Sequence, residues 1–124
     1  MAYSASTDLN NLLPEIELIN LTDDDNLGVI VESVVVNAIL QADEEIDSYI
    51  SCFTSVPLDP VPQMISHLSG RIAVYNLYRR RLLLNETWSE DYKNCKKILN
   101  SLASGKLKIN LPAGGDARYK FKAV

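Results

Sequence analysis

Residues 35–53, VVNAILQADEEIDSYISCF, decide the predicted fold class. Apolar side chains recur there at spacings of four, three, four, three and four residues, which places them on one face of an α-helix. Acidic side chains lie mostly off this stripe, so the stretch predicts a helix with one apolar face and one acidic face. The apolar positions are Val35, Ile39, Ala42, Ile46, Tyr49 and Phe53, and the acidic positions are Asp43, Glu44, Glu45 and Asp47.

A second long helix is predicted after a connection that contains Pro57, Pro60 and Pro62. We expect Asp59 to cap this helix and Pro60 to occupy its first position, because proline needs no N–H partner there. Gly70 lies in its middle, where glycine costs about 1 kcal/mol relative to alanine, and we expect it to mark a close approach between helices. The apolar positions are Val61, Ile65, Leu68, Ile72 and Tyr75.

A third long helix is predicted from residue 87 onward. Thr87 and Glu90 fit a capping box at its start. Gly105 is suited to end the helix in a left-handed conformation, which glycine adopts without a steric penalty. The apolar positions are Trp88, Tyr92, Cys95, Leu99 and Leu102, again at helical spacing.

Short segments complete the predicted fold. We expect Ser6 to cap one short helix and Pro14 to start another. Because short connections favour antiparallel neighbours, residues 1–105 are predicted to form one all-α domain, a small antiparallel helical bundle of three long and one or two short helices. Residues 106–124 alternate apolar with basic positions over parts of their length and predict an extended basic C-terminal tail, either an arm or a hairpin.

Charge is distributed unevenly along the chain. Residues 1–60 contain twelve acidic and no basic residues, whereas residues 61–124 contain four acidic and all twelve basic residues, although the net charge is only −4. Two explanations stay open: the two halves pair within one molecule, or the acidic part of one copy attracts the basic part of the next. The second explanation predicts head-to-tail self-association, which gives rings when the rotation closes.

Patterns for catalysis, metal binding and phosphate binding are incomplete. Residues 23–34 match part of a calcium loop, but Leu27 and Val34 stand where oxygen ligands are required, so we predict a solvated Asx-type turn. The only histidine, His67, is predicted to be a surface or interface residue, because no nucleophile can be paired with it. PAGGDAR, residues 112–118, lacks the strand and helix that flank a P-loop. The sequence therefore predicts neither an enzyme nor a cofactor.

The two cysteines and the apolar runs bear on the cellular compartment. Cys52 and Cys95 are too few for a disulfide framework, and both are predicted to be small buried side chains in a reducing compartment. The N-terminus lacks the regions of a secretory signal, and no apolar run approaches the roughly 18 residues of a membrane span. We therefore expect no contact with a membrane.

Arg79, Arg80 and Arg81 form the sharpest basic cluster. One interpretation is a solvated run that is favourable at a helix C-terminus because of the helix dipole. The other is contact with phosphate or with the acidic helix of a neighbour, to which Arg71 could contribute. Three consecutive residues point in different directions, so they cannot all serve one surface. The candidate interface residues are Asp43, Glu44, Asp47, Arg71, Arg79, Arg80, Arg81, Lys120 and Lys122.

Several motifs occur in the order found in a known phage family. A-x-x-E-I-D-x-Y spans residues 42–49, P-L-x-P-V-P spans residues 57–62 and I-A-x-Y-x-L spans residues 72–77. Together with the opening YSASTDLNNLLPEIELINLTD and the closing LNSLASGKLKI, they extend over about residues 3–109. The chain resembles the Mu-like phage proteins that are encoded among head and tail morphogenesis proteins. Residues 110–124 carry no family-like motif, and the motif positions are fold and packing positions.

The resemblance implies a mainly helical protein similar to the ring-forming adaptors that sit below the portal and connect a phage capsid to its tail. The expected function is a structural head-to-tail connector in virion assembly. Its expected partners are further copies of itself in a ring, the portal and tail-completion proteins, first in the host cytoplasm and then in the virion. The alternative is a DNA-contacting or regulatory phage module that uses the run from Arg79 to Arg81 and the basic tail without reading sequence.

Overall fold

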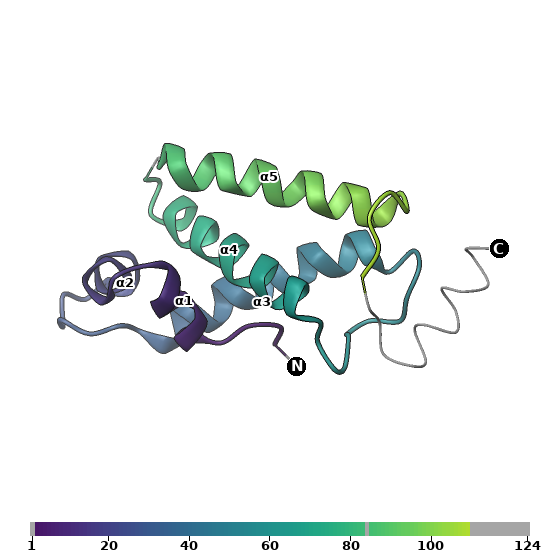
Figure 1. Ribbon diagram of the computed structural model, residues 1–124. Coiled ribbons are helices and arrows are strands. Elements are labelled where there is room, and N and C mark those ends of the chain that lie inside the picture. Colours follow the sequence, from purple (N-terminus) through teal and green to yellow (C-terminus); the bar gives the residue numbers. More distant parts are fainter. Residues whose placement is uncertain (1, 84, 110–124) are drawn as a thin grey trace.

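The computed structural model describes residues 2–83 and 85–109. Over these residues the chain forms five α-helices and no strand: α1 (Ser6–Leu12), α2 (Glu15–Thr22), α3 (Glu32–Ile50), α4 (Gln63–Arg80) and α5 (Glu86–Ala103). Figure 1 shows the three long helices running in alternating directions, with α1 and α2 gathered at one end. The predicted all-α bundle of three long and two short helices is confirmed.

The apolar stripes of the three long helices meet in one core. Val35 of α3, Ile72 of α4 and Leu99 of α5 are fully buried. Leu107 and Ile109 pack against the same core, so the first residues of the predicted tail lie on the bundle. The choice between an arm and a hairpin concerns residues 110–124, which lie outside the described part of the chain.

α4 is the central helix of the bundle. It packs against α1, α2, α3 and α5, and its buried residues lie around most of its circumference. The predicted apolar stripe is narrower than this buried surface, because a helix that is enclosed by four others retains little solvated face. Buried polar side chains on such a helix need partners. Asn76 finds one in α3, where its Nδ2 donates to the carbonyl oxygen of Ala38 over 3.2 Å.

Gly70 marks a close approach between helices, as predicted. A Cβ atom at this position would lie 3.4 Å from Cδ1 of Leu12, at the end of α1. Leu12 at the end of α1 thus lies directly over Gly70, in the middle of α4.

Two short-range caps at the N-terminal end differ from the predicted ones. Ala5 and not Ser6 is the N-cap of α1, and the Asp8 carboxylate accepts the N–H of Ala5 over 2.8 Å. Pro14 is the N-cap of α2, which begins at the next residue. The first residue of each helix thus differs from the predicted one by a single position, and helix boundaries commonly vary by that much.

The starts of α4 and α5 also differ from prediction. Pro62 and not Asp59 precedes α4. α5 starts at Glu86, and the Asn85 side chain, not Thr87, caps it by accepting the N–H of Trp88 over 3.1 Å. Pro60 lies in the connection before α4 and not at the first position of this helix. At the start of α5, the side chain of Asn85, and not that of Thr87, accepts a backbone N–H group.

The ends of α4 and α5 both use a left-handed residue. Gly105 ends α5 with φ +83°, as predicted. After α4, Leu82 has φ +58°, and the N–H groups of Leu82 and Leu83 donate to the carbonyl oxygens of Arg79 and Tyr78 over 2.9 and 3.1 Å. This is a Schellman motif in which leucine occupies the position that glycine usually takes. A side chain in the left-handed region costs roughly 1–2 kcal/mol.

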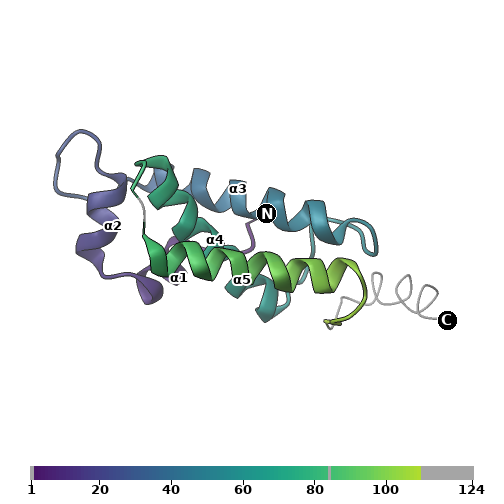
Figure 2. The ribbon, with the colours of Figure 1, turned by 90° about the horizontal axis from the view of Figure 1, so that it is seen from above.

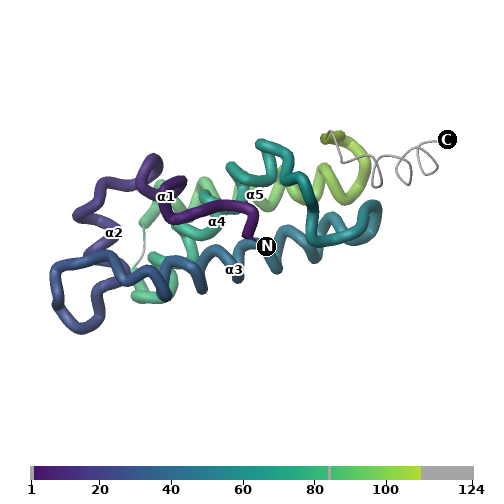
Figure 3. The backbone as a smooth tube through the Cα atoms, turned by 90° about the horizontal axis from the view of Figure 1, so that it is seen from below, coloured from purple at the N-terminus to yellow at the C-terminus, as the bar shows by residue number. Residues whose placement is uncertain are grey.

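Two further views show which segments lie on the outside of the molecule. Figure 2 shows α3 and α5 along opposite sides of the molecule, with α4 between them over part of their length. Figure 3 shows the N-terminal segment lying across α4 and reaching α3 on the underside. No helix in residues 2–83 and 85–109 is long and apolar enough to span a membrane.

Candidate protein interface

The three consecutive arginines diverge at the C-terminal end of α4. Arg80 and Arg81 both pair with Asp24 in the turn after α2, and Arg81 Nη2 lies 3.2 Å from Asp24 Oδ1. Both guanidinium groups also donate to the carbonyl oxygen of Leu21. The hydrogen bond from Arg80 lowers the pKa of Asp24. At this site the acidic and basic halves of the chain pair within one molecule, and Arg79 is left apart.

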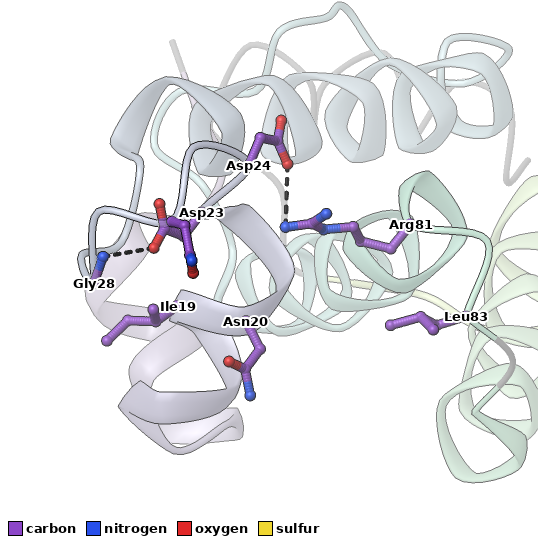
Figure 4. Close-up of a pocket in the computed structure, with 8 residues that line it drawn as sticks. Ile19, Asn20, Asp23, Asp24, Gly28, Arg81 and Leu83 are labelled. Atoms are coloured by element: carbon purple, nitrogen blue, oxygen red, sulfur yellow. Dashed lines mark hydrogen bonds and ion pairs between the residues drawn. The ribbon is translucent and has the colours of Figure 1, made fainter.

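An open cavity of about 800 Å³ lies beside this ion pair (Figure 4). At its rim the Asp23 carboxylate accepts the N–H groups of Leu27 and Gly28 over 2.9 and 2.6 Å, which lowers the pKa of Asp23. Asp23 thus closes the predicted turn with bonds from its side chain to the backbone, but they reach four and five residues along the chain and not the two residues of an Asx turn. Because Asp23 and Asp24 already accept from donors of the same chain, the cavity offers little uncompensated charge to a ligand.

Asp43 is placed differently from the prediction that it lies on the exposed acidic face of its helix. The prediction is wrong, because Asp43 is only 6% exposed in the structure. Its Oδ2 accepts the N–H of Tyr3 over 2.9 Å, and its Oδ1 accepts the hydroxyl of Ser69 over 2.6 Å. Ser69 Oγ in turn lies 2.6 Å from Ser4 Oγ. Burial raises the pKa of Asp43, since these two donors replace water only in part.

The other acidic residues of α3 lie at different depths. Asp47 accepts the hydroxyl of Tyr3, and Glu45 accepts the hydroxyl of Tyr92 over 2.8 Å. Burial and the hydrogen bond to Glu45 raise the pKa of Tyr92. Glu44 is exposed and forms no ion pair within the described residues. Among the candidate acidic residues, Glu44 is therefore the one whose charge faces solvent.

Arg71 joins α4 to α5. Its Nε and Nη2 donate to the two carboxylate oxygens of Asp91 over 3.0 and 2.7 Å, a bidentate pair that raises the pKa of Arg71. Cys95 lies next to Asp91 and is buried as predicted, and burial raises the pKa of its thiol to about 12. The prediction that Cys52 is buried is wrong, because Cys52 is exposed after the end of α3.

Arg79 and Lys96 flank a pair of stacked tyrosines. Tyr75 of α4 and Tyr92 of α5 stack with their ring centroids 4.0 Å apart and 3° between the ring planes. The Arg79 guanidinium lies 5.7 Å from the Tyr75 centroid, and Lys96 Nζ lies 5.3 Å from the Tyr92 centroid. Helical spacing assigns both tyrosines to the core, but both are only partly buried. The pairing was missed because it depends on which helices adjoin.

Two groups of exposed apolar side chains lie next to charged ones. Leu82 and Leu83, in the turn between α4 and α5, are 90% and 51% exposed. On α3, Val36 and Leu40 are 47% and 45% exposed, and Glu44 follows one turn later on the same face. The sequence did not lead us to predict that these four leucine and valine side chains are exposed, because only charged residues were considered as interface candidates. The run of leucines directly after an arginine-rich helix end was the available signal.

Within residues 2–83 and 85–109, no group of three or more His, Cys, Asp or Glu side chains is placed to hold a metal ion. A family model described as Bacteriophage Mu, Gp36 matches residues 3–122. The chain belongs to this family. The resemblance to Mu-like phage proteins is thereby confirmed, and a comparison with curated proteins found no match.

Membership of the Mu Gp36 family bears on two earlier expectations. The family match runs past residue 109, where the recognised motifs end, and includes the tail as far as Lys122. The motif residues Ala42, Ile46 and Ile72 are fully buried, as expected for packing positions. His67 is exposed on α4, which agrees with its prediction as a surface residue.

Proposed function

We propose that this member of the Mu Gp36 family is a structural subunit of a head-to-tail connector ring that bridges the portal and the tail. The observation that carries the proposal is that, within the described residues, exposed charges of both signs lie without an ion pair on different helices of one bundle. Glu44 on α3, and Arg79 and Lys97 on α4 and α5, form no ion pair within the described residues, whereas Arg71, Arg80 and Arg81 are paired internally. Complementary surfaces at different places on one molecule favour head-to-tail contacts, which close into rings.

The proposal extends to partners, location and chemistry. The ring would contact the portal on one side and tail-completion proteins on the other, after assembly in the host cytoplasm, and would remain in the virion. Its role is mechanical and involves no catalysis or cofactor. The phage family and the ion pairs that Arg71, Arg80 and Arg81 form within the chain support this role, because a closed bundle suits a spacer between two larger assemblies.

The direct test is electron microscopy of the purified full chain mixed with the portal and tail-completion proteins of its phage. We expect rings coaxial with the portal, and concentration-dependent oligomers by mass photometry of the mixture. A chain that remains monomeric and binds neither component would overturn the proposal.

The DNA-contacting alternative is less well supported by the arrangement of the arginines. Arg80 and Arg81 are held by Asp24, so Arg79 alone of the three is directed elsewhere. A phosphate-binding surface made by all three side chains would require both ion pairs to break. Binding of duplex DNA at low salt that is lost when all three arginines are changed to alanine would favour this alternative over the connector.

A further inference from the structure

A strained leucine at the turn between α4 and α5 has no visible role within one molecule. Leu82 occupies the left-handed position of a Schellman motif and is 90% exposed. Glycine would close the same turn without strain. A side chain that is strained and solvated in the monomer contributes little to folding, which points to a contact outside the monomer.

The turn presents a short pattern of apolar and basic groups. Leu82 and Leu83 are exposed side by side, and Arg79 lies one helical turn earlier. Arg79 contacts the Tyr75 ring and Asn76 but no acidic side chain within the described residues. The turn therefore carries two apolar groups and one cation without an acidic partner.

The outer face of α3 presents the complementary pattern. Val36, Leu40 and Glu44 follow one another at intervals of one helical turn and span about 12 Å at 1.5 Å per residue. The two apolar side chains are each almost half exposed, and Glu44 forms no ion pair within the described residues. The turn carries the same set of two apolar groups and one charged group in the opposite chain order and with the opposite charge, so the two patterns are complementary when the segments meet antiparallel.

We propose that the α4–α5 turn of one copy docks on the outer face of α3 of a second copy, with Leu82 and Leu83 against Val36 and Leu40, and Arg79 near Glu44. This inference rests on the proposed ring and names its contact. The occupant is a second copy because both complementary surfaces belong to this chain. They lie on different elements, and α3 forms one side of the molecule (Figure 2), so each contact leaves one turn and one α3 face available for the next copy.

Cross-linking tests the register of this contact. In the full chain with Cys52→Ser, Leu82→Cys and Leu40→Cys are prepared as separate variants, and a short bismaleimide is added to each alone and to their mixture. We expect cross-linked dimers only in the mixture. Val56→Cys, an exposed apolar position in the connection before α4, is the control and should not cross-link to Leu82→Cys. Cross-linking of Leu82→Cys to itself would indicate a two-fold contact and overturn the proposal.

Association measurements separate the contact from folding. Leu82→Gly should weaken self-association by about tenfold or more, as expected for a buried interface anchor, while the melting temperature stays equal or rises. Leu27→Ala, at another exposed apolar position, should change neither quantity. Arg79→Glu and Glu44→Arg should each weaken association, and the two variants mixed or combined should recover it. A fall in melting temperature with unchanged association would assign Leu82 to folding and overturn the proposal.

The results distinguish this inference from the proposed ring. If wild-type rings form with portal and tail components but tolerate the changes at Leu82, Leu40 and Arg79, the contact is wrong and the connector function stands. If the wild-type chain neither self-associates nor binds those components, both are wrong. Cross-linking of Leu82→Cys to the portal protein alone would assign the turn to that partner and overturn the contact between copies.

Discussion

Asp43 is a carboxylate that helical spacing places in water and the fold places in the interior. It lies beside Ala42, at the edge of the apolar stripe of α3, where spacing cannot decide which side is covered. The N-terminal segment covers it, and the Tyr3 N–H that it accepts lies 40 residues away in the sequence. Such a contact leaves no periodic signal, and this explains why the candidate interface included a buried residue.

The buried carboxylate predicts a specific pH dependence of stability. Because burial raises the pKa of Asp43 above its ordinary value of 3.8, the folded state binds this proton more tightly than the unfolded state. The contribution of Asp43 to the free energy of unfolding should decrease as pH rises from the unfolded pKa to the raised folded pKa, and should then level off. Urea unfolding between pH 4 and about 8 measures it.

Two substitutions at Asp43 separate charge from hydrogen bonding. Asp43→Asn should flatten that pH dependence and keep stability at neutral pH within about 1 kcal/mol of wild type or above it, since its amide can accept from Tyr3 and donate to Ser69. Asp43→Ala should lose about 1–3 kcal/mol, because it leaves the Tyr3 N–H without an acceptor. Equal losses in both variants would contradict this account.

The two cysteines should differ in reactivity. Cys52 is exposed, whereas Cys95 is buried with a thiol pKa raised to about 12, so its reactive thiolate is scarce at ordinary pH. We expect one thiol per native chain to react with a maleimide at neutral pH, and both in urea. Mass spectrometry of the labelled peptides identifies the residue, and labelling of native Cys95 would contradict the packing of α5 against α4.

At the scale of the helices, the spacing of apolar residues predicted which helices form better than it predicted the residues at which they begin and end. The aliphatic positions of all three stripes lie in the core, because an apolar face at helical spacing has few ways to be buried other than in a helix bundle, whereas Tyr75 and Tyr92 are only partly buried. The predicted N-caps were wrong where several residues that can cap a helix lie close together, as with Asn85 and Thr87 at the start of α5. Local residue type permits each of them, and only the packed position of the helix selects one.

Gly70 offers a test of the contact between α1 and α4. A Cβ at Gly70 would lie 3.4 Å from the flexible end of Leu12, so Gly70→Ala should be tolerated and should gain up to about 1 kcal/mol from helix propensity. Gly70→Leu needs the space that Leu12 occupies and should lose about 1–3 kcal/mol by displacing α1. Urea unfolding midpoints of the two variants should move in opposite directions, and a common midpoint would contradict the proximity of α1.

At the scale of the whole molecule, Tyr3 ties three distant parts together. Its N–H donates to Asp43, its hydroxyl donates to Asp47, and the same hydroxyl accepts the N–H of Leu58 over 2.9 Å. The start of the chain, α3 and the proline-rich connection thus meet at one side chain. Burial, together with the hydrogen bond to Asp47, raises the pKa of the Tyr3 phenol, so it remains a donor at ordinary pH.

Tyr3→Phe should therefore destabilise the whole bundle and not merely free its first residues. The buried N–H of Leu58 would lose its acceptor, and we expect a loss of about 1–3 kcal/mol in the free energy of unfolding. Thermal unfolding of Tyr3→Phe measures the loss. Tyr49→Phe, on a partly buried tyrosine of α3, serves as the comparison, and an equal effect of the two changes would argue against a special role for Tyr3.

The charge asymmetry of the chain shows what sequence can and cannot decide about the surface. Composition alone left both internal pairing and pairing between copies open, and the structure shows internal pairing between Asp24 and two arginines, Arg80 of α4 and Arg81 directly after it. The two partners lie more than fifty residues apart, so no local pattern joins them. The exposure of Leu82 was not predicted either: the run of leucines after the arginines was a signal for it, but which leucine faces solvent depends on the exact residue at which α4 ends.

The enclosure of α4 by four other helices has a consequence for how the molecule opens. Amide protons in the middle of α4 can reach solvent only when neighbouring helices separate, so their protection from exchange with deuterium should correspond to the free energy of global unfolding. Those of the turn after α2 should exchange far sooner. The slowest-exchanging amides should therefore lie in α4, because all four other helices must separate from it before the protein unfolds.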